Sequence, residues 1–192
     1  MPVATVLYED KMLAGPAGSY PLHDLVMRLV EDEVNGQTWR LHALVDKNPR
    51  RGVDNVIKDV ERTALIAGAG QLFVLVDRDV IAEHLNLPAR APDDDVVAAL
   101  KERSDASDKV HPFFLLPNIE GLLRSIRACE PTLVPSNMEA ALRKKLNDRD
   151  LVFNEAKKEA RRTLRDCVRK AQPGLDALAK AIAGVIPLEA IG

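Results

Sequence analysis

Three acidic residues follow the two clearest apolar strand-like segments of the sequence and could together bind a divalent metal ion. Glu9 comes directly after residues 3–8, and Asp77 and Asp79 come directly after residues 72–76. Carboxylate oxygens are hard ligands of the kind that Mg²⁺ and Mn²⁺ prefer. Three carboxylates gathered without a cation would repel one another and raise a pKa, and a bound metal removes that repulsion. The acids therefore indicate a metal site, provided that the fold brings the two segments together.

The elements that must position these acids alternate between strand and helix. Continuous apolar runs favour buried strands, and apolar residues at three- and four-residue intervals favour helices. Strands are predicted at residues 3–8, 41–45, 72–76 and 112–116, and helices at 22–30, 53–65, up to about 85, 93–103, from 118, 138–146, 151–171 and 175–185. This order predicts an α/β fold, a doubly wound Rossmann-like sheet of about four mostly parallel strands with a C-terminal helical extension. The α/β domain would span residues 1–130, and the extension packed on it residues 131–192.

Strand order decides whether the acids meet. In open α/β sheets, ligands bind beyond the carboxyl ends of the strands, where the strand order reverses. With a flavodoxin-like order the first and third strands are neighbours there, and Glu9 comes close to Asp77 and Asp79. Because the two aspartates are two residues apart, an extended segment would point them to the same side. For any single acid, an ordinary solvated strand end is the alternative interpretation.

Residues 6–9 (VLYE) together with residues 74–79 (VLVDRD) resemble the signature of the TOPRIM domain. That signature is a glutamate at the end of the first strand and an Asp-x-Asp at the end of the third. The resemblance implies that Glu9 is a metal ligand or general acid/base and that Asp77 and Asp79 bind Mg²⁺ or Mn²⁺. It covers roughly residues 3–125.

Residues 112–120 (PFFLLPNIE) resemble small bacterial TOPRIM-like proteins that are often associated with phage defence. In those proteins a fourth strand leads into a helix that carries an early glutamate. Glu120 is therefore a candidate fourth metal ligand. The alternative is an acid in the first turn of a helix, where the helix dipole favours it.

Basic residues are concentrated near the C-terminus, although the chain carries a formal net charge of −2. Between Arg143 and Lys170 there are eleven Lys or Arg residues and five Asp or Glu residues. Four cations step by four along one face of the predicted helix 151–171: Lys157, Arg161, Arg165 and Arg169. Such a ladder could contact the phosphates of a nucleic acid. A solvated helix face, or a surface for an acidic partner, is the alternative.

The two cysteines, Cys129 and Cys167, have no neighbouring Cys or His and are predicted to be buried reduced thiols rather than a disulfide or zinc site. The N-terminus lacks the features of a signal peptide. No apolar run approaches the ~20 residues of a membrane helix. These features predict a cytoplasmic protein without a membrane partner.

With the TOPRIM resemblance, the sequence predicts a Mg²⁺-dependent (or Mn²⁺-dependent) phosphodiester enzyme of TOPRIM type, a nuclease acting on DNA or RNA. The alternative is a non-catalytic or partner-dependent module that works with another protein, such as an ATPase. A receiver-like phosphoacceptor domain also gathers acids after its first and third strands. It needs a lysine after a fifth strand, and no fifth strand is predicted.

Overall fold

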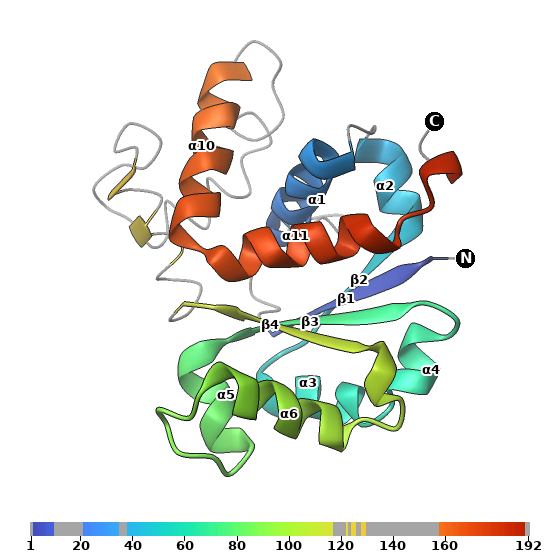
Figure 1. Ribbon diagram of the computed structural model, residues 1–192, viewed down its shortest axis with the longest axis vertical. Helices are drawn as coiled ribbons and strands as arrows, with labels where there is room; N and C mark the ends of the chain where they lie inside the picture. Colours follow the sequence, from blue (N-terminus) through green and yellow to red (C-terminus); the bar gives the residue numbers. More distant parts are fainter. Residues whose placement is uncertain are drawn as a thin grey trace.

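A parallel four-stranded sheet lies between two layers of helices (Figure 1). The computed structural model describes residues 2–9, 21–34, 38–116, 122, 124–125, 128–129 and 158–190, and the side chains of 21, 38, 39, 158–164 and 188 lie outside that description. The strands are β1 (Ala4–Tyr8), β2 (Val45–Pro49), β3 (Gln71–Asp77) and β4 (Val110–Leu115). No helix in these residues is both long and apolar enough to cross a membrane.

The strand order is β2-β1-β3-β4, and all three pairings are parallel. The prediction of a Rossmann-like α/β sheet with the first and third strands as neighbours is therefore confirmed. Strand β1 is buried along its whole length, as are residues 72–76 of β3. Burial on both faces explains why these two segments are continuous apolar runs.

The predicted strand at 41–45 is wrong. Residues 41–44 belong to helix α2 (Thr38–Leu44), and strand β2 follows it over the polar segment Val45–Pro49. The sequence of β2 is polar because it lies at the edge of the sheet, where every residue except Val45 is at least partly exposed to solvent. Pro49 is tolerated there because an edge strand needs fewer backbone donors.

Helices α1 (Pro21–Val34), α2 and α11 (Pro173–Val185) cover one face of the sheet, and α10 (Lys158–Ala171) rises beside them (Figure 1). Apolar side chains of α11 join those of β1, β3 and α1 in one buried cluster. They are Leu175, Leu178, Ala179 and Ile182. Helix α11 thus completes the core on this face.

The opposite face is covered by α3 (Val53–Val60), α4 (Thr63–Ala67), α5 (Arg78–His84) and α6 (Asp93–Arg103) (Figure 1). Residues 53–65, predicted as one helix, form parts of two, with a turn between them. The predicted helix at 93–103 matches α6. The predicted helix at 138–146 and the proposed domain boundary at 130 lie outside the described residues.

Cys129 and Cys167 form a disulfide, so the prediction of reduced thiols is wrong. Their Cα atoms are 5.7 Å apart, within the usual range for a disulfide. Cys167 lies on the buried side of α10, whereas Cys129 is exposed. The sequence could not show this pairing because 38 residues separate the two cysteines.

The junction between α10 and α11 is attached to the end of β4 by one side chain. The fully buried Gln172 amide accepts a hydrogen bond from Leu116 N (2.9 Å) and donates one to Leu116 O (2.8 Å). Gly174 packs so tightly that an added Cβ would overlap the carbonyl oxygen of Phe114. These contacts fix where α11 crosses the sheet.

Substituting Gln172 should therefore destabilise the fold. We expect Gln172→Ala to lower the free energy of unfolding by about 1–3 kcal/mol, because two backbone groups lose their partner. Gln172→Glu should also destabilise, since it replaces the amide donor facing Leu116 O with a negative charge. Urea denaturation measures both, with the exposed Lys170→Ala as the control. Unchanged stability of Gln172→Ala would contradict the role assigned to this contact.

Candidate functional site at the carboxyl edge of the sheet

The pairing of β1 with β3 brings Glu9 to Asp77. Tyr8 pairs with Leu75, so Glu9 leaves the sheet beside the last residues of β3. Its carboxylate oxygen Oε2 accepts a hydrogen bond of 2.9 Å from the backbone N–H of Asp77. Both side chains are half-buried. Two of the three predicted metal ligands therefore lie together at the carboxyl edge.

The backbone around Glu9 is held from the other side by the loop after β2. Arg50 N donates to Tyr8 O (2.7 Å), and Gly52 N donates to Glu9 O (3.2 Å). Gly52 has a φ of 80°, a left-handed conformation that favours glycine. The β2–α3 loop is thus a direct neighbour of the acidic edge.

Asp79 is placed differently from the prediction. The extended segment ends at Asp77, which precedes the first residue of α5, and Asp79 lies in the first turn of that helix, exposed to solvent. The expectation that Asp77 and Asp79 share a side of an extended segment is therefore wrong. Arg78 between them turns away, forming an ion pair with Asp93 (2.6 Å) and lying over the Phe114 ring.

The donor chemistry of this edge suits a hard cation. Mg²⁺ is usually held by one or two protein carboxylates, with water and substrate phosphates completing its shell. Glu9 and Asp77 fit that requirement. No group of three or more Cys, His, Asp or Glu side chains within the described part of the chain is arranged to hold a metal. Glu120 lies outside the described residues.

A buried imidazole supports the strand just beneath Glu9. The Tyr8 hydroxyl lies 2.8 Å from Nδ1 of His23, and both side chains are almost completely buried. Burial lowers the pKa of His23 from 6.5 to about 3, with a further lowering from the charges of His42 and Lys47. His23 is therefore neutral at physiological pH, and with its proton on Nε2 it accepts a hydrogen bond from Tyr8.

This buried histidine makes stability depend on pH. The pKa of His23 is lower in the folded than in the unfolded state, so its contribution is complete above about pH 6.5 and is lost as the pH falls toward 3. Between about pH 7.5 and about pH 4.5, the wild type should lose roughly 2–3 kcal/mol more than His23→Asn, whose amide oxygen can still accept from Tyr8. Urea denaturation at both pH values measures the difference. Equal losses would show that His23 does not cause the pH dependence.

The predicted basic ladder is partly occupied by intramolecular ion pairs. Arg165 pairs with Asp32 of α1 at 2.9 Å. Arg169 contacts Glu33 at 2.7 Å, Asp32 at 3.8 Å and Asp176 of α11. These contacts hold α10 against α1 and α11. The side chain of Arg161 and the whole of Lys157 lie outside the described residues.

Arg169 should matter for stability because it joins three helices. We expect Arg169→Gln to lower the free energy of unfolding by roughly 1–3 kcal/mol, since hydrogen bonds to charged groups are lost. The exposed neighbour Lys170→Gln is the matched control. A variant Arg169→Gln that is as stable as the wild type but binds nucleic acid less tightly would instead support the predicted phosphate contact.

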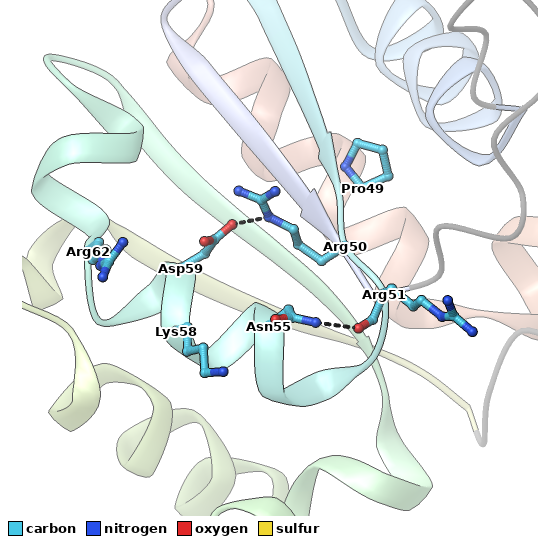
Figure 2. Close-up of a pocket in the computed structure, with 7 residues that line it drawn as sticks. All are labelled: Pro49, Arg50, Arg51, Asn55, Lys58, Asp59 and Arg62. Carbon is cyan, nitrogen blue, oxygen red and sulfur yellow. Dashed lines mark hydrogen bonds and ion pairs between the residues drawn. The ribbon is translucent and has the colours of Figure 1, made fainter.

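A basic pocket of about 350 Å³ lies on the β2–α3 loop, helix α3 and the turn after it (Figure 2). The loop of this pocket is the one that hydrogen-bonds to the backbone at Glu9. Its lining residues are Pro49, Arg50, Arg51, Asn55, Lys58, Asp59 and Arg62. Sequence reasoning missed this pocket because it ended the second strand at residue 45. Once the strand is known to end at Pro49, the Arg-Arg-Gly at residues 50–52 is the sequence feature that indicates a basic loop at the carboxyl edge.

Comparison with protein-family models, curated proteins and solved structures gave no match. The fold is an open, all-parallel α/β sheet in which Glu9 and Asp77 lie at the carboxyl edge. The TOPRIM resemblance rests on its motifs.

Proposed function

We propose that the protein is a metal-dependent phosphodiester hydrolase of TOPRIM type, a nuclease acting on DNA or RNA. One observation carries the proposal: the Glu9 carboxylate lies at the end of β3, within hydrogen-bond distance of the Asp77 backbone. This is the juxtaposition that the TOPRIM resemblance requires of these two positions. It also lies where open α/β sheets bind their ligands.

In this proposal Glu9 and Asp77 hold Mg²⁺ or Mn²⁺, and the exposed Asp79 acts on the same ion through water. A bound cation supplies charge neutralisation at a phosphate and lowers the pKa of a coordinated water. The hydrogen bond from the Asp77 N–H holds the Glu9 carboxylate at the end of β3, where it would act as a metal ligand or proton acceptor. Strands β1 and β3 provide the rigid support.

A role in phage defence and a cytoplasmic location belong to the same proposal and rest on the resemblance and the composition. The Cys129–Cys167 disulfide argues against the location, because disulfides are rare in the cytosol. The partner-dependent module remains the alternative proposal, and the activity assay below separates it from a nuclease.

Cleavage assays test the proposal. Purified protein should cut plasmid or single-stranded DNA or RNA with Mg²⁺ or Mn²⁺ and not with EDTA. Glu9→Gln and Asp77→Asn should each reduce the rate by about a hundredfold or more, because each removes a charged oxygen ligand. Asp94→Asn, an exposed acid in the first turn of α6, is the matched control and should retain full activity.

Two results would contradict the proposal. If metal-dependent cleavage survives both Glu9→Gln and Asp77→Asn, other residues bind the catalytic metal. A wild-type protein that cuts no substrate alone, yet forms a stable complex with an ATPase, would favour the partner-dependent module.

A further inference from the structure

In the basic pocket, the lining cations outnumber the acids that pair with them in the described part of the chain. Arg50 is held by Asp59, which also accepts a hydrogen bond of 3.2 Å from Asn48. Arg51, Lys58 and Arg62 are exposed, and none of them forms an ion pair with a residue in the described part of the chain. Three cations are thus left for a ligand, in a chain whose formal net charge is −2.

The other acids near the pocket belong to other contacts. Asp54 on α3 lies 3.6 Å from His84 of α5, and Glu61 lies 3.6 Å from Arg103 of α6. Both are directed toward neighbouring helices. Among the described residues, Asp59 is the acid that lines the pocket, and its carboxylate is already paired with Arg50.

The pocket is preformed. Asn55 donates a hydrogen bond of 2.7 Å to the carbonyl oxygen of Arg51, and Gly52 provides the turn between them (Figure 2). The cations therefore project from a fixed loop and helix, so less conformational freedom is lost when a ligand binds.

The arrangement of the cations selects the kind of anion. They are spread along the loop, α3 and the turn after it, from Arg51 to Arg62, and do not converge on one point (Figure 2). Among the described residues, no aromatic side chain lines the pocket, so they provide no stacking of a base. An extended chain of phosphates fits this distribution better than a single phosphate or a mononucleotide.

We propose that this pocket binds the phosphodiester backbone of a nucleic-acid strand and leads it to the acidic edge. The loop makes this continuity possible, because Arg50 and Gly52 hydrogen-bond to the backbone at Tyr8 and Glu9. The inference extends the proposed function by assigning its substrate-binding surface. Binding through backbone charge is independent of sequence and weakens with salt.

Binding without cleavage tests the inference. Fluorescence anisotropy of labelled single-stranded DNA and RNA is measured in EDTA for the wild type and for the triple variant Arg51→Gln, Lys58→Gln, Arg62→Gln. At roughly 100 mM salt we expect binding at least about tenfold weaker in the variant. The negative slope of log K (association) against log salt should become shallower by about 2, as expected for three lost phosphate contacts.

A charge-matched control separates this pocket from general electrostatics. The triple variant Arg90→Gln, Arg124→Gln, Lys170→Gln removes three exposed cations elsewhere and should bind like the wild type. Thermal unfolding checks that both triple variants fold. Equal weakening in the two variants, or no weakening in the pocket variant, would overturn the inference.

Two further measurements distinguish backbone binding by this pocket from failure of the proposed enzyme and from a small-anion site. Glu9→Gln should bind nucleic acid as the wild type does, so loss of cleavage with retained binding separates failure of the proposed enzyme from failure of the pocket. Inorganic phosphate and AMP are tested as competitors. Complete competition by either at micromolar concentration would identify a small-anion site and overturn the backbone proposal, and the absence of competition supports it.

Discussion

The parallel pairing of β1 with β3 is the constraint on which the rest of the molecule depends. It places the end of one buried strand beside the end of another that lies 68 residues further along the chain. The hydrogen bond between Glu9 and the Asp77 backbone exists only because of that register. The helices on both faces supply the apolar cover that two central strands require. Without this pairing, Glu9 and Asp77 would not lie next to each other.

Much of this arrangement could be predicted from the sequence, because its signals are local and strong. The apolar runs ending at Tyr8 and Val76 predict the two central strands, and the acids that follow each run predict where the strands end. The sequence does not reveal strand β2, because an edge strand has little apolar pattern and the apolar residues of α2 resemble a strand instead. The contact of Arg169 with α1, the disulfide and the Gln172 contact depend on segments distant in sequence, which periodicity does not reveal.

The basic residues on the two sides of the sheet have different roles: on one side they form ion pairs between helices, and on the other they remain exposed. Arg165 and Arg169 face acids of α1 and α11, and this attraction holds α10 against those two helices. Burial raises the pKa of Asp32, while the nearby charges of Arg165 and Arg169 oppose that rise. On the other side of the sheet, Arg51 and Lys58 remain exposed. A count of basic residues in the sequence could not distinguish these roles, because the distinction lies in which acids each cation faces.

The two functional proposals reinforce each other through the β2–α3 loop. Carboxylates at a strand edge repel a phosphate chain, so a site of that kind needs positive charge close by to hold its substrate. A metal held by Glu9 would neutralise part of this repulsion, and the cations after Pro49 could neutralise more. The loop that carries Arg51 and leads into α3 is hydrogen-bonded to the backbone of Tyr8 and Glu9. A change in that loop would therefore alter the geometry of the acidic edge as well as its charge, which is why exposed side chains, and not Gly52, are the informative positions to substitute.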